Sequence, residues 1–144
     1  MKLVLILLFL SVSLAAARAD DGVLGLWTNP TGSTIQIYRC GADVCAKLVA
    51  ISSQAPSQVD INNPDRSLRK RSLCGLRIGT DFHLTGPNHA EGGRLYDPKS
   101  GNTYSGSMTS DGNRLKLRGY VGFELFGRTE IWTRAQGNFA PCHA

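Results

Sequence analysis

The chain has 144 residues, of which 42% are hydrophobic and 19% charged. This length suits one domain of roughly 100–200 residues and leaves no comfortable room for a second. The formal net charge is +5, and setting aside residues 1–19 leaves 14 basic against 11 acidic residues. This excess is too small to indicate nucleic acid binding, and the one basic run, at 66–71, has no neighbouring aromatic residues on which bases could stack.

The first predicted element is a secretory signal peptide over residues 1–19. One basic residue precedes an apolar run, which ends in the small-residue pattern A-R-A of a cleavage site. The run is shorter than the about 20 residues that a membrane anchor needs. We therefore expect an exported domain, periplasmic or secreted, over residues 20–144, with no transmembrane segment once the signal is removed.

The rest of the chain has almost no helical periodicity. Short runs with alternating apolar and polar residues are divided by turn signals, which indicates an all-β domain. The predicted strands cover residues 23–28, 34–40, 45–51, 76–82, 94–97, 103–109, 114–121 and 124–134.

Three predicted connections bear on function. Residues 52–73 form the longest one, and long loops in compact domains are usually functional or mobile. A glycine-rich loop is expected over 85–93. The stretch R-L-Y-D-P-K-S-G-N-T-Y at 94–104 is predicted to be a hairpin and not part of an active site, because Pro98 presets the φ angle of a turn and Gly101 tolerates positive φ.

The four cysteines are an even set, as expected for a protein of an oxidising compartment. Three pairings are possible. Residues 41–44 have the length of a four-residue hairpin loop, which would place Cys40 opposite Cys45, with Cβ atoms about 4.5–5.5 Å apart. This geometry favours a disulfide between them and leaves Cys74 and Cys142 to pair across the fold.

Eight strands joined in sequence order tend to pair with their neighbours. A small exported protein can hide the two sheet edges by closing the sheet into an up-and-down antiparallel barrel. The interior of such a barrel is either filled by side chains or holds one small ligand. Gly106 and Gly119 would leave room inside. The residues expected to point inward are Ile35, Ile37, Leu48, Ile78, Leu95, Tyr104, Met108, Leu115, Leu117 and Trp132.

Several short motifs in this order resemble the DUF2147 family of exported bacterial proteins. They are G-L-W at 25–27, I-Y-R-C-G at 37–41, N-N-P-D at 62–65, L-C-G-L at 73–76, G-G-R-L-Y-D-P at 92–98, R-G-Y-V-G at 118–122, G-R-T at 127–129 and W-T-R at 132–134. The resemblance covers nearly all of the mature chain. Since the family has no assigned function, it implies no catalytic residue.

The chain also shows a looser similarity to lipocalin-type barrels. Those begin with Gly-x-Trp on the first strand and carry a basic residue near the end of the last strand, which covers the tryptophan ring. Gly25, Trp27 and Arg134 match these positions. A guanidinium stacked on an indole contributes about 0.5–2 kcal/mol, so these residues are expected to close one end of the barrel.

Enzyme motifs are missing from the sequence: there is no G-x-S-x-G, H-E-x-x-H or glycine-rich phosphate loop. A zinc site is not predicted, because the histidines at 83, 89 and 143 have no ligand-like spacing to the cysteines. No cofactor is predicted either. A hydrolytic site would require convergence of loop acids with His83 or His89. The acids in question are Asp60, Asp65, Asp81, Glu91 and Asp97.

The sequence therefore favours a binding module for a small apolar or lipid-like ligand of the cell envelope. The alternative is a structural or partner-binding envelope protein with a packed barrel, and a hydrolytic enzyme is less favoured. The loop over 52–73 would cover the mouth of the barrel, with its basic residues at an anionic headgroup. The oligomeric state is left open. The residues expected to contact the ligand are Arg69, Lys70, Arg71, Tyr104, Met108 and Trp132.

Overall fold

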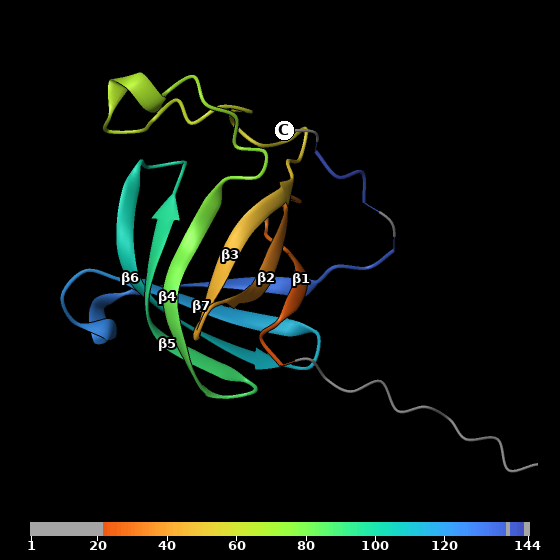
Figure 1. The fold of residues 1–144 in the computed structure, drawn as a ribbon, viewed down its shortest axis with the longest axis vertical. Coiled ribbons are helices and arrows are strands. Elements are labelled where there is room, and N and C mark those ends of the chain that lie inside the picture. Colours follow the sequence, from red (N-terminus) through yellow and green to blue (C-terminus); the bar gives the residue numbers. More distant parts are fainter. Residues whose placement is uncertain (1–21, 138, 143–144) are drawn as a thin grey trace, which may run out of the picture.

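The computed structural model describes residues 22–137 and 139–142, so the predicted signal peptide lies outside the described residues. Eight antiparallel strands close into a barrel in sequence order (Figure 1). The predicted all-β, up-and-down barrel is therefore confirmed. The strands are β1 (Gly25–Thr28), β2 (Thr34–Cys40), β3 (Asp43–Ala50), β4 (Arg77–Gly86), β5 (His89–Asp97), β6 (Asn102–Asp111), β7 (Arg114–Tyr120) and β8 (Arg128–Arg134), with short 3-10 helices η1 (Arg66–Leu68) and η2 (Glu124–Phe126).

The prediction of a glycine-rich loop over 85–93 is wrong. Strand β4 runs to Gly86 and β5 begins at His89, so only two residues separate them. The glycines serve the strand itself: the β5–β6 register shifts between Ala90 and Gly93, and a Cβ atom at Gly93 would overlap the ring of Phe82. Glycine here makes room for an aromatic ring, a packing reason that a turn-based interpretation misses.

The predicted strand over 124–134 is also too long at its start. Residues 124–126 form η2, closed by a hydrogen bond from the Gly127 amide to the Glu124 carbonyl, and β8 begins only at Arg128. The apolar side chains of Leu125 and Phe126 are 80% and 79% exposed. These apolar residues are therefore not buried strand residues.

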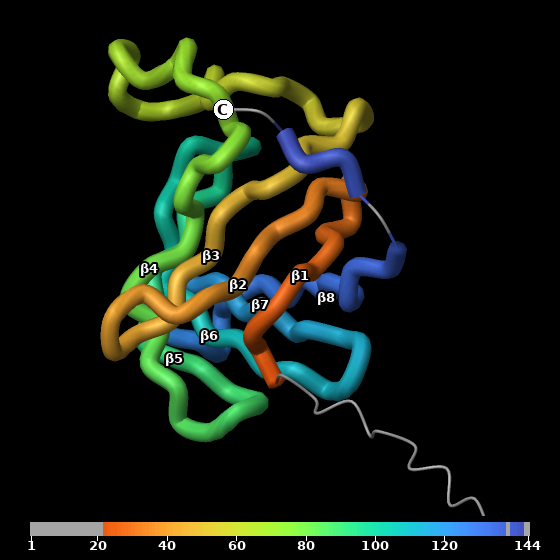
Figure 2. The backbone as a smooth tube through the Cα atoms, turned by 45° about the vertical axis from the view of Figure 1, so that its right-hand side comes forward, coloured from red at the N-terminus to blue at the C-terminus, as the bar shows by residue number. Residues whose placement is uncertain are grey.

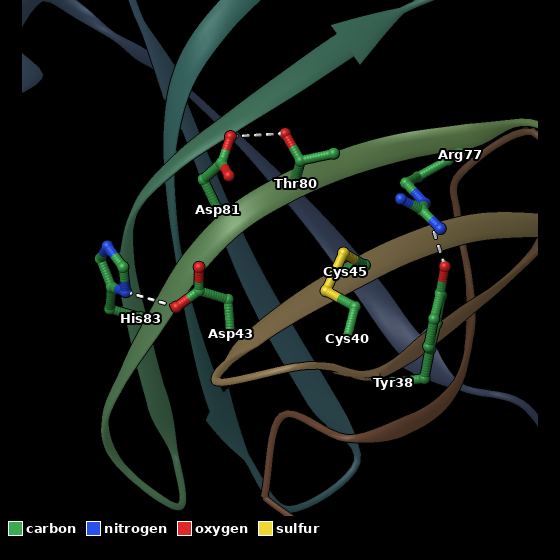
Figure 3. The surroundings of a disulfide bond; sticks show 8 residues. All are labelled: Tyr38, Cys40, Asp43, Cys45, Arg77, Thr80, Asp81 and His83. Atoms are coloured by element: carbon green, nitrogen blue, oxygen red, sulfur yellow. Dashed lines mark hydrogen bonds and ion pairs between the residues drawn. A yellow bond between two sulfur atoms is a disulfide. The ribbon is translucent and has the colours of Figure 1, made fainter.

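Both predicted disulfides are confirmed, but the hairpin that carries the first one is tighter than expected. Strands β2 and β3 are joined by two residues, and Cys40 pairs with Asp43 while Cys45 pairs with Tyr38. The two cysteines are thus diagonal neighbours, with Cα atoms 5.8 Å apart (Figure 3). The twist of a two-stranded ribbon brings one diagonal pair within disulfide range. The second disulfide joins Cys74 to Cys142.

One end of the barrel, called the closed end here, carries the β2–β3, β4–β5 and β6–β7 turns. Trp27 is fully buried there and its indole Nε1 donates to the Val23 carbonyl at 2.9 Å. The Arg134 guanidinium lies 3.9 Å from the centre of the Trp27 ring and donates to the Leu24 carbonyl at 2.7 Å. A Cβ atom at Gly25 would stand 3.1 Å from Arg134 Nη1, so a small residue suits this position. This is the closure expected of Gly25, Trp27 and Arg134.

The core fills the half of the barrel next to the closed end. The ring of Phe82 occupies its middle, against the backbones of Gly79, Gly93 and Gly106, where added Cβ atoms would approach the ring too closely. Met108 is 1% exposed in this packed half. The other end, called the open end, carries the β1–β2, β3–β4, β5–β6 and β7–β8 connections, and the long β3–β4 segment arches across it (Figure 2).

Candidate functional site

A cavity of about 770 Å³ extends from the other half of the barrel into the space between the connections of the open end. Its deep wall is apolar and comes from five strands. The side chains that form it are Leu48, Ile78, Leu95, Leu117 and Trp132. They share this wall because side chains alternate along each strand, so every second residue faces the barrel interior. The interior is therefore packed at one end and hollow at the other.

Two interior glycines explain where the hollow begins. The space beside Gly106 is taken by Phe82, whose Cζ would lie 3.2 Å from an added Cβ atom. Gly119 lies on the cavity wall, and an added Cβ atom there would meet only Tyr104, at 3.7 Å. Of the two glycines expected to leave room, only Gly119 does so.

The mouth of the cavity is charged. Asp97 and Lys99 belong to the β5–β6 hairpin, and Arg128 and Glu130 lie on β8. Both acids already accept hydrogen bonds: Glu130 accepts from the Trp132 indole at 2.6 Å, and Asp97 accepts from the backbone amide of Lys99 at 3.0 Å. The cavity thus presents an apolar interior and a charged mouth with two cations, Lys99 and Arg128, and two acids, Asp97 and Glu130.

Of the residues expected to contact a ligand, Tyr104 and Trp132 line the cavity. Met108 does not, because it lies in the packed half. Arg69, Lys70 and Arg71 are not among the lining residues either.

The cations at the mouth, Lys99 and Arg128, were not predicted. Arg128 could have been found from alternation alone, because it lies four residues before the inward-facing Trp132 on the same strand.

The three basic residues of the β3–β4 segment have other surroundings. Arg71 forms an ion pair with Asp60 at 2.8 Å, and Arg69 Nε donates to the Asn63 carbonyl at 2.8 Å. Lys70 is exposed. Arg69 and Arg71 therefore hold the segment together. The sequence around them does not predict these contacts.

A buried polar cluster, called the latch here, fastens this segment to the barrel. The Asp60 carboxylate is fully buried and accepts hydrogen bonds from the Tyr96 hydroxyl at 2.5 Å, Asn63 Nδ2 at 2.7 Å and Arg71 Nε at 2.9 Å. Beside it, Asn62 Nδ2 donates to the Lys99 carbonyl at 2.9 Å. The predicted β5–β6 hairpin thus exists, and it serves as the docking site of the long segment.

One glycine in the hairpin makes this docking possible. Gly101 has a φ angle of 73°, and a Cβ atom there would overlap the Asn62 carbonyl. Both the turn and the close approach of the segment require glycine at this position.

The latch shifts the pKa values of its two acidic groups in opposite directions. Burial opposes ionisation of Asp60, but the hydrogen bonds from Tyr96, Asn63 and Arg71 outweigh it and hold the pKa of the carboxyl below its ordinary value of 3.8. Burial and the hydrogen bond to Asp60 raise the pKa of Tyr96 to about 12. The carboxylate is therefore ionised and the phenol protonated at neutral pH.

The loop acids do not converge on one histidine. Asp60 belongs to the latch, while His83 Nδ1 lies 2.6 Å from Asp43 and His89 Nε2 lies 3.3 Å from Glu91, so each histidine has its own acidic partner although His83 and Glu91 are neighbours across β4 and β5. Among residues 22–137 and 139–142, no three His, Cys, Asp or Glu side chains gather in a way that could hold a metal ion. His143 lies outside the described residues.

No helix among residues 22–137 and 139–142 is long and apolar enough to span a bilayer.

Comparisons with known proteins agree with this architecture. The family model DUF2147, described as an uncharacterised protein conserved in bacteria, matches residues 25–134. A solved structure of protein HP1028 from Helicobacter pylori, described as belonging to the lipocalin family, superposes with a TM-score of 0.70 at 22% sequence identity, covering 78% of this chain and 82% of that one. This similarity shows a shared lipocalin-like fold. No curated protein matches the chain.

Proposed function

The chain belongs to the DUF2147 family, and we propose that it is an exported binding protein for a small, largely apolar, lipid-like molecule. The observation that carries this proposal is the cavity of about 770 Å³ in the open half of the barrel. Ligand pockets commonly enclose about 300–1,000 Å³ and are lined mainly by apolar side chains with a few polar groups. A barrel with a solid core, which the structural alternative requires, would not contain such a space.

The ligand is placed with its apolar part inside and its polar part at the mouth. Leu117 and Trp132 supply apolar surface at depth, and Lys99 and Arg128 lie at the rim. No ion pair involves either cation within the described part of the chain. Each cation is therefore able to form a charge-assisted hydrogen bond with an anionic headgroup, although Asp97 and Glu130 lie at the same mouth. These residues take the role first assigned to the basic run at 69–71.

The β3–β4 segment is the proposed lid. Ala55, Pro56 and Val59 form one side of the mouth, and the latch at Asp60 holds them in place. Since the latch joins the segment to the barrel through side chains and not through strand pairing, its opening would widen the mouth without unfolding the barrel. The export and the boundaries of the mature domain, 20–144, belong to the same proposal. The two disulfides support them, since disulfides persist in oxidising compartments.

The test is a titration of the purified protein with a fluorescent fatty acid, comparing wild type with Gly119→Phe. Gly119 has room beside it and lies on the cavity wall, so the new ring would project into the cavity and obstruct it without straining the backbone. The matched control is Ser105→Phe, which adds the same ring at an exposed position of β6. We expect saturable binding by wild type and by Ser105→Phe, and its loss in Gly119→Phe. Absence of saturable binding by wild type would refute the proposal.

A second pair of variants tests the headgroup contact. Lys99→Ala with Arg128→Ala removes both cations of the mouth, whereas Arg66→Ala with Lys70→Ala removes two exposed cations of the lid that do not line the cavity. We expect the first pair to weaken fatty acid binding about tenfold or more, since charge-assisted hydrogen bonds contribute about 1.5–3 kcal/mol, and the second to leave it unchanged. Equal effects of the two pairs would keep the cavity but refute the headgroup assignment.

A further inference from the structure

The β7–β8 connection exposes an unusual amount of apolar surface. Residues 121–126, called the apolar loop here, have the sequence V-G-F-E-L-F. Val121, Phe123, Leu125 and Phe126 are 77%, 76%, 80% and 79% exposed. The loop projects from the side of the barrel, away from the β3–β4 segment (Figure 1). Large apolar side chains gathered in this way mark an interaction surface.

Several backbone groups of the loop already have hydrogen-bond partners within the protein. Arg118 donates to the Glu124 carbonyl at 2.7 Å and to the Leu125 carbonyl at 3.0 Å. The Phe126 amide donates to the Phe123 carbonyl at 3.1 Å. A backbone segment can enter an apolar medium only when its hydrogen-bonding groups have partners. These hydrogen bonds at the Phe123, Glu124 and Leu125 carbonyls therefore lower the cost of bringing the tip of the loop into the lipid surface.

The only charged side chain in the loop is turned back toward the barrel. Glu124 Oε1 accepts a hydrogen bond from the Ser107 hydroxyl at 3.0 Å. This contact draws the carboxylate away from the apolar tip, while the Arg118 guanidinium lies against the Glu124 and Leu125 carbonyls and Arg128 follows the loop after Gly127. The tip therefore presents apolar side chains with a cation beside them, which suits an anionic surface with an apolar layer beneath it.

The shape of the tip favours lipid over a protein partner. In a 3-10 helix with three residues per turn, successive side chains point about 120° apart. Leu125 and Phe126 therefore diverge, and no single flat face collects the apolar side chains. A fluid apolar medium can surround such a tip on all sides, whereas a folded partner surface would cover only part of it.

We propose that the apolar loop inserts into the surface of a lipid bilayer that bears anionic headgroups and so docks the barrel on a membrane. This inference goes beyond the proposed function and does not depend on it, since it rests on the outer loop and not on the cavity. The two sites are nevertheless continuous, because Val121 and Phe126 also line the cavity mouth. Docking through this loop would bring the mouth to the bilayer.

The test is vesicle flotation of the purified protein with phosphatidylcholine vesicles, alone or mixed with phosphatidylglycerol. The variant is Phe123→Ser with Leu125→Ser, since neither residue lines the cavity. The matched control is Ile61→Ser with Leu68→Ser, which removes two exposed apolar side chains elsewhere on the surface. We expect wild type and control to float with mixed vesicles. The variant should bind them at least about tenfold more weakly, because it buries less apolar surface.

Several outcomes would overturn this inference. They are absence of binding by wild type, unchanged binding by Phe123→Ser with Leu125→Ser, and equal binding to phosphatidylcholine alone, which would remove the anionic requirement. Self-association that the same variant abolishes, without vesicle binding, would instead make the loop an interface between copies of this chain. Failure here is distinguishable from failure of the proposed function, because Gly119→Phe should still float while it no longer binds the soluble fatty acid.

Discussion

The latch gives the sharpest prediction about how the lid is held. Asp60→Asn keeps the size of the side chain but replaces one carboxylate oxygen by an amide that only donates hydrogen bonds. The remaining oxygen can still accept from Tyr96, whereas the new amide faces the donors of Asn63 and Arg71. The substitution therefore removes two of the three hydrogen-bond partners of the wild-type carboxylate.

The expected cost follows from these contacts. Hydrogen bonds to a charged acceptor contribute about 1.5–3 kcal/mol each, so two lost bonds cost roughly 3–6 kcal/mol. Part of this is offset because a neutral amide costs less to bury than a carboxylate. We therefore expect the free energy of opening the β3–β4 segment to fall by about 2–4 kcal/mol, which corresponds to a roughly 30- to 900-fold change in the opening equilibrium.

Hydrogen exchange measures this opening residue by residue. The amide of Asp60 donates to the Arg71 carbonyl and that of Leu73 to the Gln58 carbonyl, both at 3.0 Å, so both report on the segment. The matched control is Asp65→Asn, because Asp65 is exposed and caps η1 outside the latch, where asparagine is an equally good cap. Equal exchange rates in the two variants would refute the assignment of the latch to Asp60.

Three further predictions concern stability. Because the pKa of Tyr96 is raised to about 12 in the folded protein, its contribution to stability is complete below pH 10 and is lost as the pH rises to 12. The free energy of unfolding should fall by on the order of 2–3 kcal/mol over this range. In denaturant titrations at several pH values, Tyr96→Phe should remove this part of the pH dependence. In thermal unfolding, Trp27→Ala should lower the free energy of unfolding by about 3–5 kcal/mol and Arg134→Ala by about 1–3 kcal/mol. A loss for Trp27→Ala as small as that of an exposed residue would contradict its role in closing the barrel. Replacing both cysteines of the Cys74 disulfide, which spans 68 residues, should cost about 4 kcal/mol, against about 2 kcal/mol for the Cys40 disulfide, which spans 5; the reverse order in chemical denaturation would show that loop entropy does not govern these bonds.

The errors in the sequence interpretation have one physical origin. The glycines at 85–93 predict a turn, but Gly93 faces the ring of Phe82 inside the barrel. The apolar residues at 124–126 predict a buried strand, but they form an exposed loop. In both cases a local preference was judged without knowledge of the residue across the fold. A glycine beside a ring and a glycine in a turn are identical in sequence.

The sequence by itself determined what depends on neighbours along the chain. Alternation with a period of two predicted the strands, short turns predicted their sequential pairing, and the cysteines near one hairpin predicted a disulfide. Only the tertiary structure decided where the interior is hollow, because the Phe82 ring fills the space beside Gly106, whereas only Tyr104 approaches Gly119. It likewise assigned Arg71 to Asp60 and not to the cavity mouth. Cavities and buried ion pairs arise between residues far apart in sequence, so closing the barrel is what creates them.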